Sequence, residues 1–499
     1  MKKRIGYRRI PKLSKSSFTA GLQCLKRLYL ESYHRDLAAP IDEAQQALFD
    51  AGALVGEMAR QLYPGGILMD HDYLHIDEAV ASTKALLGDT SLAAIYEAGF
   101  EFDDIRVRTD ILARAKGGRF DLVEVKSGTG VKEEHIPDLA IQLYVLRGAG
   151  VRAGRTWLAH LNKDYVYPGG GYDLDQLFKV EDVSKRVQEY QAEIPPALRQ
   201  MRLALREADA PDIEPGRQCS VPYDCPFFDF CHQDAPEYPV SELPRATERL
   251  LMRLKAAGIR DIREIAPGFS GLNPLQKRVR DCVVEGRAYI DPAVRAELQG
   301  LVYPVHFLDF ETFSPAIPRY AGTRPYQAVP FQWSDHILGA DGKLTHEEFL
   351  HDGKGDPREP LARSLLETLG AGGSIMVYSG FEEARIRELA RDLPRFSKDL
   401  LALLEGRLVD LLPILQRHCY HPDFHGSFSL KAVLPALVPD LDYDDLAITD
   451  GQAASLAYEE IIYEGTTDDR REQLREELLR YCGRDTEAMV RLVETLLRR

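Results

Sequence analysis

One stretch, residues 105–128, constrains the fold more than any other part of the chain. Two runs rich in β-branched and apolar residues flank Gly117-Gly118, which predicts two antiparallel strands joined by a tight turn. Side chains alternate between the two faces of a strand, so Glu124 and Lys126 point the same way. The sequence therefore predicts a carboxylate and an ammonium group presented together at the end of a strand.

The position of Asp110 on the first strand depends on the length of the turn. A two-residue turn would place Asp110 opposite Val125, whereas a three-residue loop with a glycine bulge places it opposite Glu124 or Lys126. We predict the three-residue loop. Two carboxylates that share a divalent cation, with a lysine beside them, suit the attack of water on a phosphodiester. The alternative is a surface hairpin with an ordinary ion pair.

Length and charge limit the class of protein. The chain has 499 residues, so we expect at least two domains. No apolar run approaches the ~20 residues of a membrane span, and the basic N-terminus lacks the apolar segment of a signal peptide, so we expect a cytoplasmic protein. A net charge of −15 argues against a generic nucleic-acid coat, but metal sites in nucleases are built from carboxylates. Basic strips at residues 2–9 and 277–280 would then hold phosphates.

Apolar residues at helical spacing predict helices on both sides of the hairpin. In the first helix, Ser16 or Ser17 is the expected N-cap and Cys24 lies inside the helix. The second helix carries Glu57, and the third is amphipathic with Gln142 off its apolar stripe. These helices are predicted over residues 13–33, 44–63 and 133–150.

Three of the seven cysteines lie close together, with five residues between successive members: Cys219, Cys225 and Cys231. In a cytoplasmic protein this grouping indicates metal binding rather than disulfides, and Cys24 is the candidate fourth ligand. Four thiolates are the usual ligands of an iron–sulfur cluster, so we expect a 4Fe–4S cluster, with zinc as the alternative. Either would act as a structural clasp. The remaining cysteines are interpreted as ordinary core residues: Cys282, Cys419 and Cys482.

A second group of acidic residues lies towards the end of the chain. Asp309 and Glu311 are two apart in VHFLDFETF, an apolar strand, and therefore share a face. Glu382 falls in the first turn of a later helix. In the last helix Tyr481 and Asp485 are four apart and share a face. The four acids would hold two divalent ions, with Tyr481 orienting the attacking water; the alternative treats each as an isolated surface acid.

With these residues identified, residues 1–235 resemble the RecB-type PD-(D/E)XK nucleases that carry an iron–sulfur clasp, as in AddB and the CRISPR adaptation nucleases. The resemblance implies a restriction-endonuclease-like fold. It assigns metal binding and catalysis to Glu57, Asp110, Glu124, Lys126 and Gln142. The chain departs from relatives that begin with a Cys-x-x-Cys pair, and it has Tyr144 instead of a tyrosine four residues after Gln142.

Residues 300–499 resemble RNase H-like exonucleases of the DEDD type, in the variant that carries a tyrosine. Asp309 and Glu311 match the first motif, and Tyr481 with Asp485 matches the third. The second motif, usually Asn-x-x-Phe-Asp, ends here in Glu382. The resemblance implies trimming of a strand end from 3′ to 5′. Residues 421–434 also resemble an uncharacterised bacterial domain found behind RecB-like modules.

These patterns together predict an α/β protein with a nuclease-like domain over 1–235, a helical segment over 236–299 and an RNase H-like domain over 300–499. In the helical segment, Ala257-Gly258-Ile259 fits either a helix-hairpin-helix turn or a plain glycine C-cap. We expect a nuclease that uses Mg²⁺ or Mn²⁺ on DNA that is single-stranded or has free ends, in repair, recombination or defence. The alternatives are a nucleic-acid-binding scaffold with one or both modules inactive, and an RNA exonuclease.

Overall fold

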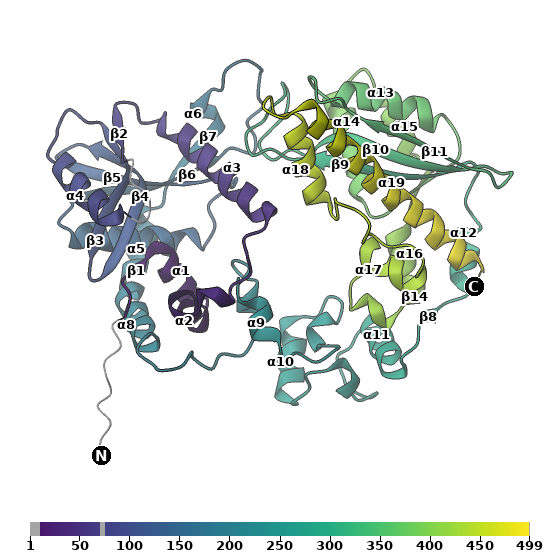
Figure 1. Cartoon of the computed structure of the whole chain (residues 1–499), viewed down its shortest axis with the longest axis horizontal. Helices are drawn as coiled ribbons and strands as arrows, with labels where there is room; N and C mark the ends of the chain where they lie inside the picture. Colours follow the sequence, from purple (N-terminus) through teal and green to yellow (C-terminus); the bar gives the residue numbers. More distant parts are fainter. Residues whose placement is uncertain (1–9, 70–74, 499) are drawn as a thin grey trace. The chain divides into compact units, whose positions relative to one another are not determined.

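The chain is a mixed α/β protein, seen here in a computed structural model that describes residues 10–69 and 75–498. It divides into two compact units (Figure 1). The first ends at Asp234 and also contains Pro315–Tyr326; the second comprises Ala235–Ser314 and the chain from Gln327 onwards. The basic strip at residues 2–9 lies outside the described residues. No helix in the described ranges is both long enough and apolar enough to cross a membrane.

This division differs from the three parts expected from the sequence. Residues 236–299 belong to the second unit, where β8 (Tyr289–Ile290) pairs with β14 (Cys419–Tyr420). The connection after the DxE strand belongs to the first unit, where Ala316 and Ile317 are buried in the core. Each unit is therefore built from two separate stretches of sequence.

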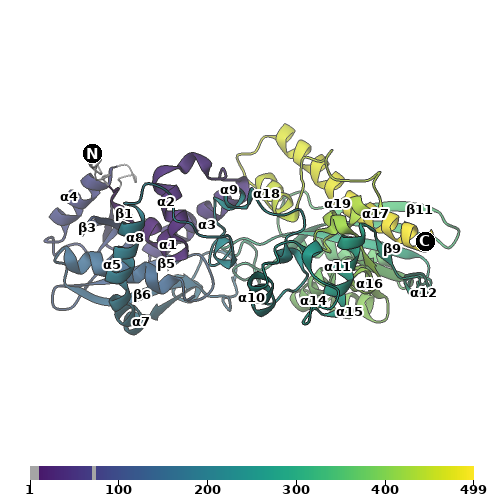
Figure 2. The same ribbon diagram turned by 90° about the horizontal axis from the view of Figure 1, so that it is seen from below.

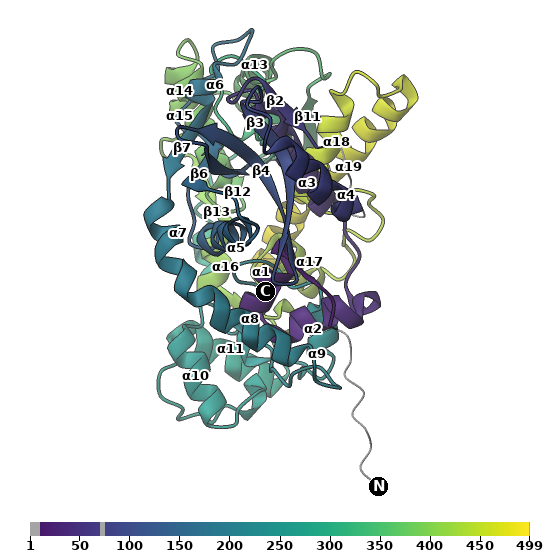
Figure 3. The ribbon, with the colours of Figure 1, turned by 90° about the vertical axis from the view of Figure 1, so that its left-hand side faces the viewer.

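The first unit is organised around one mixed sheet. Strands β3, β4 and β5 are antiparallel neighbours, and α5 (His135–Gly148) leads from β5 to β6, which runs parallel to β5. Helices α3 (Glu43–Arg60) and α5 pack on opposite faces of this sheet (Figure 3). The strand order is β2 (Gly66–Leu68), β3 (Ala94–Phe102), β4 (Ile105–Ala115), β5 (Arg119–Lys126), β6 (Ala153–Leu161) and β7 (Phe178–Asp182).

The β4–β5 hairpin has the three-residue loop that the sequence predicts. Ala115 pairs with Arg119, which leaves Lys116, Gly117 and Gly118 as the loop. Both glycines have positive φ angles, 74° and 69°, a conformation that a residue with a Cβ rarely adopts. The register runs on to the pair Ile111 and Val123, so the next position sets Asp110 beside Glu124.

The predicted single helix over residues 13–33 is wrong. The structure has two helices, α1 (Lys15–Gln23) and α2 (Leu25–Tyr33), separated by Cys24 in an extended conformation. The N-cap is Ser14, whose hydroxyl accepts a hydrogen bond from the Ser17 amide, and β1 (Leu13–Ser14) pairs with β4. Because the Cys24 amide still donates to Ala20, the chain leaves the helical conformation at one residue only.

The prediction of an amphipathic α5 is also wrong. Ten of its residues, including Gln142, are buried, because the sheet covers one side of the helix while α1, α7 (Ser184–Tyr190) and α8 (Ile194–Ala204) pack around it. A helix enclosed in this way buries polar side chains only where they have partners.

The second unit contains a five-stranded sheet with helices on both faces. The first three strands along the chain are antiparallel, and the last two run parallel to β9. Helices α14 (Phe381–Asp392) and α15 (Ser397–Leu404) cover one face, and α18 (Gly451–Ile461) and α19 (Asp468–Arg498) cover the other (Figure 2). Helix α13 (Arg358–Leu369) packs on the same face as α15. The strand order is β11 (Leu344–Leu350), β10 (Val329–Leu338), β9 (Val305–Phe313), β12 (Ser374–Val377) and β13 (Leu408–Asp410).

The turn at Ala257-Gly258-Ile259 is a glycine C-cap of α10 (Glu248–Ala256). Gly258 has a φ of 74°, and the Ile259 amide donates to the Leu254 carbonyl. The next two amides both donate to the Glu264 carboxylate, so the turn offers a phosphate none of the free N–H groups of a helix-hairpin-helix.

The basic strip at residues 277–280 is only partly exposed, with Lys277 at the surface. The Arg278 guanidinium donates to the Gln416 carbonyl and lies over the Tyr289 ring, while Arg280 is buried. Packing of α11 (Pro274–Glu285) in the second unit thus leaves Lys277 as the one fully exposed charge of this strip.

Candidate active sites and cysteine cluster

The first acidic site lies where β4 and β5 run side by side. The Val125 amide donates a hydrogen bond of 2.7 Å to Asp110 Oδ2, which holds this carboxylate at the edge of β5. Glu124 is buried, with 1% of its side chain exposed. The strands thus bring together the two carboxylates that the sequence predicts as metal ligands.

Lys126 lies between two carboxylates. Its Nζ atom is 2.8 Å from Glu124 Oε1 and 2.6 Å from Asp138 Oδ2, in the first turn of α5. Asp138 is a site residue that the sequence reasoning missed. It lies four residues before Gln142, so the two share one face of α5, and this spacing is the signal that could have revealed it.

A second lysine, Lys15, also reaches this site and was missed entirely. Its Nζ atom is 2.9 Å from Glu124 Oε1, although 109 residues separate the two in the chain. On the next turn of α1, the Thr19 hydroxyl donates to Asp138 Oδ1 at 3.3 Å. Helix α1 therefore forms one wall of the site.

Gln142, near the middle of α5, also belongs to the site. Its side-chain amide nitrogen donates to Glu124 Oε2 at 2.7 Å and to the Asp138 carbonyl at 3.1 Å. Its Oε1 atom is buried and has no hydrogen-bond partner among the described residues. A buried, unpaired acceptor is costly, so this oxygen is available to a ligand or water.

Burial and charge act in opposite directions on the two carboxyls. Burial and the neighbouring Glu124 charge raise the pKa of Asp110 to about 7. Burial also opposes ionisation of Glu124, but the attraction of Lys126 and Lys15 outweighs it and holds the pKa of Glu124 well below its usual range. For Lys126, the same attraction outweighs burial and raises the pKa of its ammonium group. Glu124 is therefore ionised and Lys126 charged at neutral pH.

Glu57 lies apart from these contacts. It is an exposed residue of α3, the helix on the opposite face of the sheet from α5. Among the described residues, no hydrogen bond or ion pair connects it to Asp110 or Glu124, so its role as a metal ligand stays a prediction.

All four predicted cluster cysteines line one small cavity: Cys24, Cys219, Cys225 and Cys231. All four are free thiols. The Gln23 side chain donates to the carbonyls of Gln218 and Tyr223, at 2.7 and 2.6 Å, and so fastens the end of α1 to the cysteine loop. Burial raises the pKa of the Cys225 and Cys231 thiols, which keeps them protonated until a metal displaces the proton.

The spacing of these sulfur atoms bears on what they would hold. Tetrahedral zinc, with Zn–S bonds of about 2.3 Å, needs sulfurs about 3.8 Å apart. Among the described residues, the group of three or more ligand atoms that lie within 4.8 Å of one another is in the second unit and includes none of these four cysteines. The four cysteines share one cavity, and both the iron–sulfur cluster and zinc stay predictions for it.

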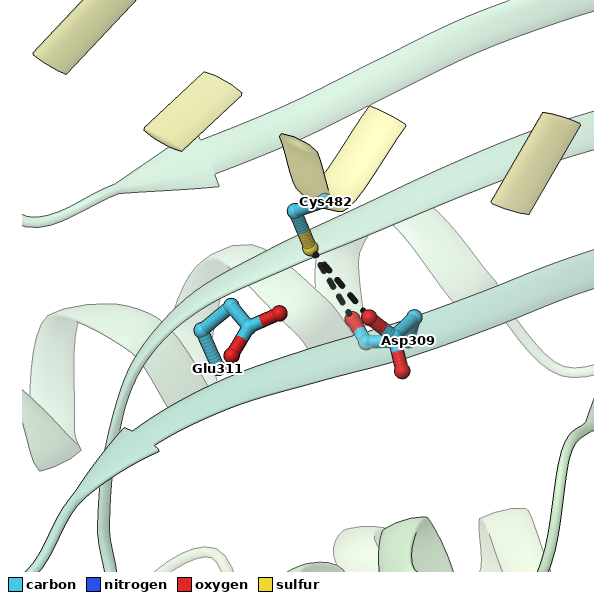
Figure 4. Close-up of side chains that lie close together, drawn as sticks. All are labelled: Asp309, Glu311 and Cys482. Carbon is cyan, nitrogen blue, oxygen red and sulfur yellow. Dashed lines mark hydrogen bonds between the residues drawn. The ribbon is translucent and has the colours of Figure 1, made fainter. Parts of the chain in front are cut away.

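The second acidic site lies between β9 and α19. Asp309 and Glu311 project from one face of β9, and the Cys482 thiol of α19 points towards Asp309, with Sγ 3.6 Å from Oδ2 (Figure 4). These three residues form the compact group of potential metal ligands noted above. Cys482 is buried, as expected, but the interpretation of it as an ordinary core residue is wrong, because its sulfur lies against a carboxylate.

The other predicted acids of this site are buried in the same place. Glu382 is 2% exposed and Asp485 is 8% exposed, and each contributes with Asp309 to one electrostatic cluster. Glu382 Oε2 has no hydrogen-bond partner within the described part of the chain. A carboxylate oxygen without a hydrogen-bond partner, in a cluster of acids, is a suitable ligand for a divalent cation.

Tyr481 is buried beside two residues that the sequence reasoning did not place in the site. The Tyr443 hydroxyl donates to Asp485 Oδ1 at 2.5 Å. The Lys431 Nζ atom lies 5.1 Å from the Tyr481 ring centroid and 5.6 Å from that of Tyr443. Nothing local in the sequence marks Tyr443 as a partner of Asp485, since 42 residues separate them.

Burial is the main cause of perturbed acidity in this second site. It raises the pKa of Asp309 well above the usual range, and the nearby Asp485 adds to the effect. The pKa of Glu311 rises for the same reasons, first burial and then repulsion by Asp309. Acids that repel one another in a buried site bind a divalent cation readily, because the cation removes the repulsion.

Comparisons with known proteins describe only part of the chain. Residues 306–429 match a family described as a domain of unknown function (DUF2779), a segment that contains Asp309, Glu311 and Glu382. No curated protein matches the chain. A solved structure described as "Crystal structure of SSO0001" is 14% identical, over 38% of this chain and 79% of that one, with a TM-score of 0.19. A score this low leaves the topology and the sites as the basis for any functional conclusion.

Proposed function

We propose that the chain is a divalent-metal-dependent nuclease with two hydrolytic modules, one in each unit, acting on DNA. The observation that carries this proposal is the set formed by Asp110, Glu124 and Lys126 on two adjacent strands, with Lys126 Nζ 2.8 Å from Glu124. Two carboxylates for a cation and one charged lysine are the components that hydrolysis of a phosphodiester needs.

Sheet topology supports the two fold families. In the first unit, three antiparallel strands followed by a helix and a parallel fourth strand fit a PD-(D/E)XK domain. In the second unit, the order β11-β10-β9-β12-β13 fits an RNase H-like domain. Such topologies host many functions, so the sites and not the folds carry the argument.

In the first module, Asp110 and Glu124 would hold Mg²⁺ or Mn²⁺, with Glu57 as a further ligand if it reaches the site. The cation supplies activation of water and polarisation of the phosphoryl oxygen. Lys126, held by Glu124 and Asp138, orients the attacking water and neutralises charge that develops on the phosphate. The Gln142 side-chain nitrogen donates to Glu124 Oε2 and so fixes this carboxylate. The Gln142 Oε1 atom, which has no hydrogen-bond partner among the described residues, would accept a hydrogen bond from the nucleophile.

In the second module, Asp309, Glu311, Glu382 and Asp485 would hold the same type of cation. Tyr443 fixes the Asp485 carboxylate, and Tyr481 orients the attacking water. Burial raises the pKa of the Tyr481 hydroxyl, so this group stays protonated and acts as a hydrogen-bond donor. As in the resembled family, cleavage would proceed from 3′ to 5′.

The four cysteines would hold a 4Fe–4S cluster as a structural clasp, with zinc as the rival. The position of all four cysteines on one cavity supports a shared metal centre. The cluster joins Cys24, between α1 and α2, to the end of the first unit, and contributes no hydrolytic group. The substrate would be DNA that is single-stranded or has free ends, in the cytoplasm, during repair, recombination or defence against foreign DNA.

The proposal is tested by incubating end-labelled single- and double-stranded DNA and RNA with the protein and Mg²⁺ or Mn²⁺. Wild type is compared with Lys126→Ala, Asp309→Ala and the double variant. We expect each single variant to lose a different set of products and the double variant to lose all cleavage.

Other results would redirect or overturn the proposal. Faster degradation of RNA than of DNA would assign an RNA substrate. Binding without cleavage in any metal would favour a scaffold that retains the folds. Cleavage that survives in the double variant would come from neither site.

A further inference from the structure

Lys15 is held in the first site by local structure that the proposed mechanism does not use. It is the first residue of α1, and its position is fixed by the Ser14 N-cap and by the pairing of β1 with β4. From there its Nζ atom reaches Glu124 Oε1 at 2.9 Å, with 26% of the side chain exposed. The backbone of Lys15 is therefore fixed while its side chain is partly exposed to solvent, so that the ammonium group can bind a ligand.

Lys15 is the more easily displaced of the two lysines. Lys126 is held by both Glu124 and Asp138, at 2.8 and 2.6 Å. In the described part of the chain, Lys15 has an ion pair with Glu124 alone. Both ammonium groups donate to the same oxygen of Glu124, Oε1, while Gln142 donates to Oε2. A divalent cation at Glu124 would repel both ammonium groups, and Lys15 has no second partner to retain it.

The charge of the loaded site depends on Lys15. Three carboxylates, Asp110, Glu124 and Asp138, face two ammonium groups, Lys15 and Lys126, so the ionised site has a net charge of about −1. One divalent cation changes this to about +1, which one phosphodiester neutralises. Without Lys15 the loaded site has no net charge. The positive end of α1 adds to the attraction that Lys15 provides.

We propose that Lys15 contacts the phosphate next to the bond that is cleaved, and so acts as a second, substrate-binding lysine of the first module. This inference rests on the proposed nuclease function and adds a residue to that site. It also explains why α1 is attached to the cysteine cluster: Lys15 begins the helix and Cys24 follows its last residue, so the clasp fixes the helix that carries the lysine.

The test uses the full chain and two measurements. The first is cleavage of end-labelled single-stranded DNA in an Asp309→Ala background, which isolates the first module. Lys15→Gln should lower kcat/KM by about 10- to 100-fold, the range for loss of a hydrogen bond to a charged group, mainly through KM. Lys15→Arg should restore most of this loss. Lys12→Gln is the matched control, because Lys12 is exposed and pairs with Glu101 outside the site.

The second measurement separates a phosphate contact from a structural ion pair. Binding of a fluorescent single-stranded DNA is followed against salt concentration in a Lys126→Ala/Asp309→Ala background that does not cleave. One lost phosphate contact lowers the slope of log K against log[salt] by about 0.7. We expect this change for Lys15→Gln and no change for Lys12→Gln.

Each outcome decides the inference. An unchanged slope, with cleavage reduced only as far as the folded fraction falls in thermal unfolding, overturns it. If the Asp309→Ala protein does not cleave but the slope falls, the nuclease function of the first unit fails while Lys15 remains a phosphate contact. If no nucleic acid binds at all, both proposals fail.

Discussion

In the first acidic site every carboxylate near Glu124 has an ammonium group or a backbone amide as a partner. In the second site four carboxyl groups lie together, and among the described residues no lysine or arginine is within ion-pair distance of any of them. The Lys431 ammonium group instead lies over the rings of Tyr443 and Tyr481, which are next to these acids. The lysines of the first site therefore balance the charge of its carboxylates, whereas among the described residues no ion pair does so in the second site.

This difference predicts how each site depends on metal. Glu124 is held ionised by Lys15 and Lys126 before any cation arrives, so the first site is preorganised. Asp309 and Glu311 instead keep raised pKa values because burial and mutual repulsion disfavour ionisation. Protein charges stabilise the first site, and the second needs protons or metal ions.

The largest effect is expected when one glutamate of each site is replaced by glutamine and the unfolding free energy is measured without metal. Glu124→Gln leaves Lys15 without a charged partner and Lys126 with Asp138 alone. Breaking a buried ion pair from one side costs about 3 kcal/mol of unfolding free energy. Glu311→Gln removes one of several mutually repelling acids, so the unfolding free energy should stay constant or rise by up to about 1 kcal/mol. Glu124→Gln should thus lower the unfolding free energy, whereas Glu311→Gln should not.

The two tryptophans of the chain allow each unit to be followed separately in urea with EDTA. Trp157 is in β6 of the first unit and Trp333 in β10 of the second. A Trp333→Phe background reports Glu124→Gln, and a Trp157→Phe background reports Glu311→Gln. Equal destabilisation by both variants would show that the second site is already neutralised.

Loss of the cysteine cluster should affect the first unit alone. In the proposed cluster, Cys24→Ser would remove a cross-link that closes a loop of almost two hundred residues, and cross-links of this length are worth about 3–5 kcal/mol. We expect the visible absorbance of an anaerobic preparation to disappear and the Trp157 transition to move to lower urea. Cys282→Ser, a buried cysteine of the second unit, is the control. Full iron content in Cys24→Ser would remove Cys24 from the ligand set, and a colourless wild type loaded with zinc would select the rival metal.

Sequence patterns predicted the contacts that depend on strand register and helical spacing. Strand alternation and the Gly117-Gly118 turn were enough to predict that Asp110 lies opposite Glu124 or Lys126, because register follows from loop length, and the structure selects Glu124. Helical spacing was enough to predict that Tyr481 and Asp485 share a face. These predictions depend on residues close in the chain.

Residues brought together by distant segments escaped prediction. Lys15 is 109 residues from Glu124, and a lysine at the start of a helix has no local feature that marks its partner. Tyr443 and Lys431 meet Tyr481 only through tertiary packing. Cys482 was interpreted as a core residue because burial can be inferred from an apolar helix face, whereas the Asp309 carboxylate opposite it cannot.

The pH dependence of stability should distinguish the two metal-free units. Carboxyls whose folded-state pKa is raised bind more protons folded than unfolded, so their contribution is full below about pH 4 and is lost as pH rises, by up to about 1.4 kcal/mol per pH unit per proton. Asp309, Glu311 and Glu382 give the second unit this slope. In the first unit Asp110, with a pKa raised to about 7, gives a shallower slope of the same sign.

Glu124 behaves in the opposite way, because its pKa is lowered in the folded state. Its contribution is complete above about pH 4.3 and is lost only as the solution becomes more acidic. Urea midpoints between pH 4.5 and 7.5 in EDTA should therefore fall more steeply for Trp333 than for Trp157, and excess Mn²⁺ should flatten both. Parallel slopes in the two units would contradict the contrast between the sites.

The smallest expected effect concerns the thiol that only the second site contains. Cys482→Ser keeps a small polar group beside Asp309 but removes the soft sulfur, so Mg²⁺-dependent cleavage by the second module should change by less than about 3-fold, under 1 kcal/mol. Binding of Cd²⁺, which prefers thiolates, should weaken more than that of Mn²⁺, because Cys482 lies within ligand distance of Asp309 and Glu311. Titration of both ions into an Asp110→Asn/Glu124→Gln background, which lacks the proposed ligands of the first site, measures this preference, with Cys419→Ser as the buried control. If Cd²⁺ affinity is unchanged, the sulfur packs against the acids without binding metal, and the carboxylates are then the metal ligands of both sites.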